Sequence, residues 1–123
     1  MVENHAEVRD LVGRMVALLG WVPVKVGSVT EAVTRLRQGG IDAVIADWQL
    51  DDGDGEVLLR QARTVTGELP VPVVMISSYA SPELRAQARA AGAVDLLEKP
   101  FRLEQLCTLL KRQLSARAAA AVV

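Results

Sequence analysis

The sequence predicts an α/β fold in which a doubly wound parallel sheet has helices on both faces. Three short runs rich in apolar residues carry this prediction: residues 43–46, 72–76 and 94–97. Each is too short for a buried helix and is closed by a polar residue, as expected for interior strands of a parallel sheet. Segments with helical spacing separate these runs, and such alternation implies parallel pairing. With 123 residues, 50% of them hydrophobic, the chain is long enough for one domain with a buried core.

The first part of the chain supplies two helices and an edge strand. Apolar residues at helical spacing predict a helix over residues 8–19, and Asn4 and Glu7 have the form of a capping box before it. Residues 22–26 are mostly β-branched, but Pro23 restricts them to a strand start or a sheet edge. A second capping box, formed by Ser28 and Glu31, then begins a helix that ends at Gly39 and Gly40.

The remaining helices follow the three interior strands. The strand at residues 43–46 ends at Asp47, and the next eight residues contain two glycines and three further acids, which predicts a turn. Ser81 and Pro82 are favoured at the N-cap and at the first helical position. The helices are expected over residues 56–64, 81–91 and 103–114.

Polar residues follow several strands of the predicted sheet. The carboxyl ends of parallel strands share one edge, where ligands bind. A small number of hard oxygen ligands suits Mg²⁺, because the ion keeps some of its water ligands and binds phosphate oxygens as well. A lysine and a hydroxyl can hold the other oxygens of a phosphoryl group that a carboxylate attacks. On its own, Asp47 could be a strand-end residue at which the chain turns toward solvent. The whole set of polar residues at the strand ends, however, indicates acyl phosphate chemistry. Its members are Glu3, Asn4, Asp47, Ser77 and Lys99.

In their order along the chain, these motifs resemble the receiver domains of two-component response regulators, the family that includes the single-domain chemotaxis regulators. That family has an acidic pair, an Asp, a Thr or Ser, and a Lys-Pro after its first, third, fourth and fifth strands. The resemblance covers residues 2–114 and implies a flavodoxin-like sheet with strand order 2-1-3-4-5. The receiver domain is expected over residues 1–117, followed by a tail at 118–123. The matching positions are Glu3-Asn4, Asp47, Ser77 and Lys99-Pro100, with further matches at Asp54-Gly55, Ala91-Gly92-Ala93 and Phe101.

The resemblance also implies a role for each site residue. Asp47 would accept a phosphoryl group from a histidine kinase or a histidine phosphotransfer protein, and the chain would signal through protein contacts without being an enzyme. Lys99 would pair with the phosphoryl group, Ser77 would follow it on activation, and the bond before Pro100 would be cis. The cofactor would be Mg²⁺, held by Glu3, Asn4, Asp47 and the backbone carbonyl of Gln49.

Three positions depart from the family pattern. Asn4 stands where the family usually has Asp, and a neutral amide is a poorer magnesium ligand than a carboxylate. The affinity for Mg²⁺ should therefore fall, although Asn4 could equally be an N-cap. Asp51 replaces a common proline and makes the loop after Asp47 more acidic. Leu96 stands where the family often has a Tyr or Phe that rotates inward, so the aromatic half of the usual switch is absent.

Composition narrows the partners and the location. The net charge of -1 offers no general attraction to nucleic acid or to anionic lipid, and no window approaches the roughly 18 apolar residues of a membrane span. The N-terminus has no signal-peptide pattern, and the single Cys107 fits a reducing compartment. A cytoplasmic protein with protein partners is expected. The partner surface is expected at the last two helices and the fifth strand, at Arg85, Arg89, Asp95 and Arg102.

Two other functions remain open. Asn4 and Leu96 are compatible with a receiver-like binding module that is never phosphorylated. A phosphatase of the haloacid dehalogenase type also uses a strand-end Asp but needs a second Asp two positions later, where this chain has Gln49. His5, beside the acidic pair, is assigned no role, because a lone histidine in the first turn of a helix usually faces solvent.

The first strand is almost missing. It should be central in the order 2-1-3-4-5, yet only Met1 and Val2 precede the acidic pair. An empty slot would cost ~1 kcal/mol per lost hydrogen bond and ~1.5–3 kcal/mol per unpacked apolar side chain. Either the natural chain is longer at its N-terminus, or residues 119–123 run through the slot in parallel, from the same chain or from a neighbour. Alanines favour helix and pack a sheet poorly, which argues against the second possibility.

Overall fold

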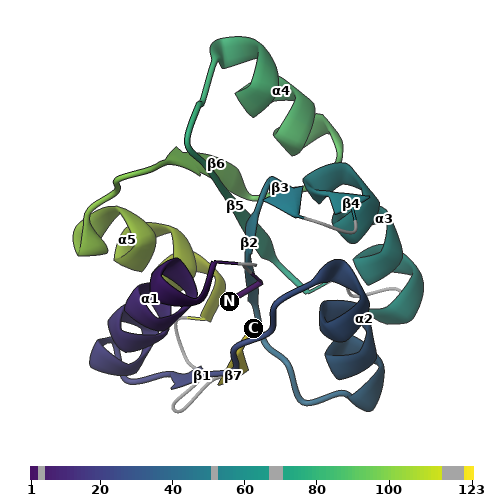
Figure 1. Ribbon diagram of the computed structural model, residues 1–123, viewed down its shortest axis with the longest axis vertical. Helices are drawn as coiled ribbons and strands as arrows, with labels where there is room; N and C mark the ends of the chain where they lie inside the picture. The colour runs from purple at the N-terminus through teal and green to yellow at the C-terminus, as the bar shows by residue number, and fades with distance from the viewer. Residues whose placement is uncertain (3–4, 51–52, 67–70, 115–120) are drawn as a thin grey trace.

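The computed structural model describes residues 1–2, 5–50, 53–66, 71–114 and 121–123, and it shows a parallel sheet between two layers of helices (Figure 1). The predicted α/β architecture is confirmed. No helix in these ranges is long and apolar enough to cross a membrane. The helices are α1 (Ala6–Leu18), α2 (Val29–Gln38), α3 (Gly55–Thr66), α4 (Pro82–Ala90) and α5 (Leu103–Leu114). The strands are β1 (Val22–Pro23), β2 (Val44–Asp47), β3 (Gln49–Leu50), β4 (Gly53–Asp54), β5 (Val73–Ser77), β6 (Asp95–Glu98) and β7 (Ala121–Val122).

Local capping explains where most helices begin. Ser81 Oγ accepts a hydrogen bond from Leu84 N at 3.0 Å, and Asp54 Oδ1 accepts one from Val57 N at 3.1 Å. Each bond satisfies a backbone donor that the first helical turn leaves unpaired. The prediction that Asn4 caps α1 is wrong, because His5, whose own backbone is extended, is the N-cap. His5 makes no side-chain capping bond.

The interior strands pair in parallel in the order β2-β5-β6. All residues of β2 and β5 are buried, as expected for strands covered on both faces. β1 and β7 form a second parallel pair, which isolated bridges connect to β2. The combined order is β1, then the slot of the missing first strand, then β2, β5 and β6, and it confirms the predicted order 2-1-3-4-5.

The core has two halves, one on each face of the sheet. On one face, apolar side chains of the sheet pack with α1 and α5; on the other they pack with α2 and α3 (Figure 1). The α1/α5 half includes Val12, Val16, Ile45, Ile76, Leu106 and Leu110. The α2/α3 half includes Ala32, Leu36, Val44, Leu58, Met75 and Leu96.

Both ends of the chain lie in the middle of the sheet, between β1 and β2 (Figure 1). Parallel bridges connect Val2 to Val26 and Ala46, and Val122 to Ala43. Of the two possibilities left open by the sequence, the less favoured one is confirmed for residues 121–123, which run through the slot in parallel; residues 119–120 lie outside the described part of the chain. Residues 121–123, which the sequence assigns to a tail beyond the domain, are thus part of its sheet. Val122 and Val123 are fully buried.

The structure predicts that the stability of this 123-residue chain depends on pH, because the amino group of Met1 is buried and donates to Val24 O at 2.8 Å. Burial, and then the positive charges of Arg9 and Lys25, lower the pKa of this amino group from 8.0 to about 5. Between these values the unfolded chain binds the proton and the folded chain does not. Stability from this group is therefore fully present above pH ~8 and is lost as the pH falls through ~5.

Urea denaturation at pH 5, 6, 7 and 8 tests this expectation. The free energy of unfolding should rise by up to about 4 kcal/mol across the series, at about 1.4 kcal/mol per pKa unit. Lys25→Gln removes one of the charges that lower the pKa, so it should narrow the pH window and reduce the total rise in the free energy of unfolding. A flat profile would contradict the assignment.

Candidate functional site

Asp47 lies at the carboxyl end of β2, and its residue surface is only 7% exposed. Its backbone N–H donates to Val2 O at 3.0 Å, so the N-terminal segment holds the strand end. A buried carboxylate is costly unless charge partners and hydrogen bonds compensate it. The side chain of Asp47 has both.

Lys99, from the end of β6, forms an ion pair with Asp47, in which Nζ contacts Oδ2. The other carboxylate oxygen, Oδ1, accepts a hydrogen bond from the backbone N–H of Gln49 at 2.8 Å. Lys99 is in turn fixed to the neighbouring strand, because its N–H donates to Ser77 O at 2.8 Å. The structure thus brings together Asp47 and Lys99, 52 positions apart, as the strand-end argument predicts. The Lys99–Pro100 bond is cis, as the resemblance implies.

Ser77 ends β5 beside this pair and is 8% exposed. Its hydroxyl oxygen accepts a hydrogen bond from Tyr79 N at 3.2 Å, which leaves the hydroxyl hydrogen to donate elsewhere. The site opens into a cavity of about 300 Å³ that could admit a phosphoryl group. Its lining residues are His5, Asp47, Trp48, Gln49, Ser77, Ser78, Tyr79, Leu84 and Lys99.

Trp48 and Gly55 fix the loop that follows Asp47. Gly55 N donates to Trp48 O at 2.7 Å, and a Cβ on Gly55 would lie 2.6 Å from Trp48 Cε3 and also collide with Met75. Only glycine permits this approach. The sequence predicts a turn here, but the loop also contains a short antiparallel hairpin of β3 and β4. Trp48 is 7% exposed and lines the cavity, so its indole lies where it can report on events in the site.

The predicted magnesium ligands are only partly described. Glu3 and Asn4 lie outside the described residues, while Asp47 and Gln49 line the cavity. Among the residues that are described, no group of three or more His, Cys, Asp or Glu side chains could hold a metal ion. The chemistry of the donor set still fits Mg²⁺, because its members offer oxygen atoms: carboxylates, an amide and a backbone carbonyl.

Two further residues, one in the site and one in the core beneath it, have surroundings that the sequence did not specify. His5 is exposed and lines the cavity, although the sequence assigns it no role. Its place at the helix N-cap, directly after the acidic pair, is the signal that could have located it. Leu96, which stands where the family often has a Tyr or Phe, is fully buried in the α2/α3 half of the core.

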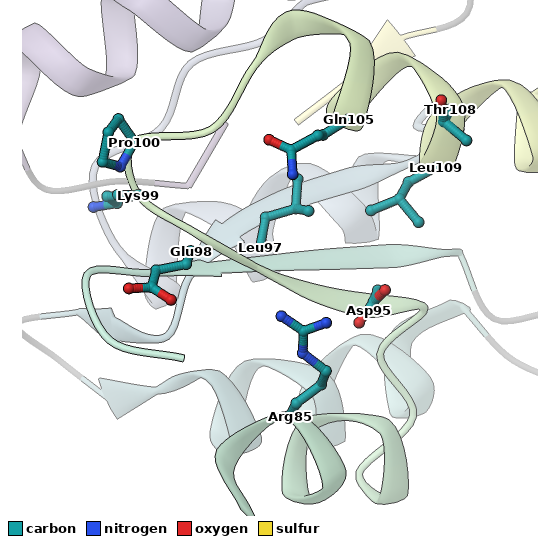
Figure 2. Close-up of a pocket in the computed structure, with 9 residues that line it drawn as sticks. All are labelled: Arg85, Asp95, Leu97, Glu98, Lys99, Pro100, Gln105, Thr108 and Leu109. Atoms are coloured by element: carbon teal, nitrogen blue, oxygen red, sulfur yellow. The ribbon is translucent and has the colours of Figure 1, made fainter. Parts of the chain in front are cut away.

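A second cavity, of about 650 Å³, lies where α4, β6 and α5 meet (Figure 2). Arg85 points into it from α4, and Asp95 reaches it from β6. Asp95 also forms an ion pair with Arg89, in which Oδ1 lies 3.1 Å from Nη2. Arg102 is exposed before α5. The lining residues are Arg85, Asp95, Leu97, Glu98, Lys99, Pro100, Gln105, Thr108 and Leu109.

Known proteins share this fold and these sequence features. The family model described as the response regulator receiver domain matches residues 1–111. The phosphate regulon transcriptional regulatory protein PhoB of Escherichia coli is 28% identical over 111 residues, which are 90% of this chain and 48% of PhoB. The chain therefore spans about half the length of the curated relatives it matches first.

Solved structures of receiver domains give the same result. The receiver domain of NtrX from Brucella abortus is 28% identical, with a TM-score of 0.83 over 94% of this chain and 96% of that one. The receiver domain of the sensor histidine kinase PA1611 from Pseudomonas aeruginosa, with a magnesium ion coordinated in its active site cleft, is 26% identical, with a TM-score of 0.82 over 94% of each chain. This chain belongs to the response regulator receiver domain family of two-component signalling, whose members are signalling modules rather than enzymes.

Proposed function

We propose that Asp47 is the phosphoacceptor of a two-component phosphorelay and that the chain signals through protein contacts. The observation that carries the proposal is the buried Asp47 carboxylate, held between Lys99 Nζ and Gln49 N at the mouth of a cavity. Because the chain belongs to the receiver family, the alternative of a phosphatase of the haloacid dehalogenase type is excluded.

The geometry supports a direct transfer. One carboxylate oxygen of Asp47 attacks the phosphorus atom of a phosphohistidine, while the phosphorus–nitrogen bond breaks and the nitrogen leaves with the electron pair. The ammonium group of Lys99 then shifts from the carboxylate to an oxygen of the phosphoryl group. The hydroxyl of Ser77 donates a hydrogen bond to a second phosphoryl oxygen. Burial strengthens both interactions.

Magnesium is the proposed cofactor, since the PA1611 receiver domain holds it in its active site cleft. Glu3, Asn4, Asp47 and the backbone carbonyl of Gln49 would hold the ion. Bound there, Mg²⁺ neutralises negative charge on the transferred phosphoryl oxygens.

The proposed phosphodonor is a histidine kinase or a histidine phosphotransfer protein in the cytoplasm. The proposed output surface, here the α4-β6-α5 face, is defined by Arg85, Arg89, Asp95 and Arg102. Of the residues of α4 only Ala88 is buried, so this helix is anchored by few contacts and is easily displaced. The cavity beside Arg85 and Asp95 offers charges of both signs to a partner.

A phosphorylation-independent binding module is the second candidate. It is favoured by the fully buried Leu96, which stands where the family often has the aromatic residue of the switch, and by Asn4 in the proposed ligand set.

The first test is incubation of the chain with acetyl phosphate and Mg²⁺, followed by intact-mass measurement. We expect the mass of one phosphoryl group on the parent and none on Asp47→Asn. Lys99→Ala should slow the reaction by at least about tenfold, because a charge-assisted contact to the transferred group is lost. Asp10→Asn, an exposed acid paired with Lys25, is the matched control and should react like the parent. An unchanged parent mass would favour the binding module.

The second test concerns magnesium affinity. Asn4→Asp restores a formal negative charge to the proposed ligand set, so it should lower the Mg²⁺ midpoint of Trp48 fluorescence by on the order of tenfold, which is about 1.4 kcal/mol. Asn4→Ser, which adds no charge, should leave the midpoint at or above the parent value. Equal midpoints for parent and Asn4→Asp would show that this position does not contact the metal.

The third test locates the output surface. Amide hydrogen exchange with and without a partner captured by the phosphorylated chain should slow on α4, β6 and the start of α5. Exchange in α2, which lies at the opposite end of the molecule from α4 (Figure 1), should stay the same. Protection confined to α2 would contradict the proposed face.

A further inference from the structure

The two ends of the chain form a single strand in the slot between β1 and β2. Met1 and Val122 pack into the α1/α5 half of the core, whereas Val2 and Val123 pack into the α2/α3 half. Side chains of a strand alternate between the two faces of a sheet. Read as residues 122, 123, 1 and 2, the slot shows this alternation without a break.

The backbone hydrogen bonds continue across the junction in the same way. Towards β2, Val123 N donates to Ala43 O at 3.0 Å and Ile45 N donates to Val123 O at 2.6 Å. The next residue pair in register follows at once, because Val2 N donates to Ile45 O at 2.8 Å and Asp47 N donates to Val2 O. Ile45 is therefore bound by both chain ends, through its N–H and through its carbonyl.

The side towards β1 repeats this register. Val24 N donates to Val122 O at 2.8 Å, and Val26 N donates to Met1 O at 3.1 Å. The amino group of Met1 donates to Val24 O. Residues 121–123 thus fill one half of a parallel ladder, whose other half Met1 and Val2 occupy.

We propose that the groove between β1 and β2 is a binding site for an extended apolar segment in parallel orientation, that residues 121–123 are its ligand, and that occupancy positions Asp47. The recognition elements are the backbone N–H groups of Val24, Asp42 and Ile45, which donate to residues 122, 121 and 123. The Asp42 carboxylate also accepts from Ala121 N at 2.9 Å. Side-chain specificity comes from two fully buried positions, Val122 and Val123. This is strand addition inside a single chain.

The coupling to Asp47 runs through Ile45, two residues earlier on β2. When residues 121–123 leave the groove, the N–H of Ile45 loses its hydrogen-bond acceptor. The first half of β2 then has no paired strand on this side. On this side of β2, Val2 is then the remaining partner of the strand end, while β5 still pairs with the other side. This last part of the proposal rests on the proposed phosphoacceptor function, whereas the docking itself does not.

Val122→Asp tests the docking, since it puts a charge into the α1/α5 half of the core. Val22→Asp is the matched control: it is the same change on the neighbouring strand, at a residue that is 48% exposed. We expect exchange of the Val24, Asp42 and Ile45 amides to rise at least about tenfold in Val122→Asp only. If Val122→Asp fails to fold, Val122→Ala is used, and the same three amides should still be the most accelerated. In the parent, full exposure of these amides while Val44 and Val94 stay protected would overturn the proposal.

A peptide supplied in trans tests the site as a binding site. The peptide Ala-Ala-Ala-Ala-Val-Val, which is residues 118–123, should slow exchange of the three amides again in the Val122→Asp chain. The same peptide with Asp in place of its first Val should not. No protection by the first peptide at millimolar concentration, or equal protection by both, would overturn the assignment of the groove.

Phosphorylation by acetyl phosphate separates the two parts of the proposal. The rate in Val122→Asp should fall at least about fivefold and recover with the first peptide, while Val22→Asp keeps the parent rate. A parent that gains no phosphoryl mass overturns the proposed function but leaves the exchange results as the test of docking. An unchanged rate in a variant whose three amides have lost protection overturns the coupling to Asp47.

Discussion

The structure depends on the need of β2 for a hydrogen-bonded neighbour on each side. Every residue of this strand is buried, so each of its backbone polar groups must find a partner within the protein. β5 supplies the partners on one side. On the other side, the two ends of the chain pair with β2 and together take the place of one strand. This explains why a short apolar segment far along the sequence lies in the centre of the domain.

The candidate site is a consequence of the same sheet. Parallel strands end on one edge, so Asp47, Ser77 and Lys99 meet although they lie at the ends of three different strands. The strands bring only backbone positions together; short contacts complete the site. The bond from Lys99 N to Ser77 O and the bond from Gln49 N to the Asp47 carboxylate orient the charged groups towards a common cavity.

Much of this could be predicted because the signals are local or follow from parallel pairing. Apolar runs identified the strands, and capping residues such as Ser81 identified helix starts. The strand-end rule identified Asp47 and Lys99. What the sequence could not show depends on geometry between distant segments. The N-cap of α1 is His5, whose side chain makes no capping bond that a sequence pattern could have indicated. The entry of residues 121–123 into the slot overrides the helical preference of alanine, because two valines become fully buried and the exposed ladder groups of both neighbours find partners.

The ion pair of Asp47 with Lys99 is better explained by chemistry than by stability. Desolvating two charges costs about as much as their attraction returns, so well-packed apolar residues would often serve a fold equally well. Here the two charges lie beside a cavity rather than in the closed core, and a hydroxyl stands next to them. A carboxylate that already has its cation at hand needs little reorganisation when negative charge arrives on a transferred group. In the proposed phosphoacceptor function, the free-energy cost of burying the pair is therefore already met in the resting protein, before phosphoryl transfer.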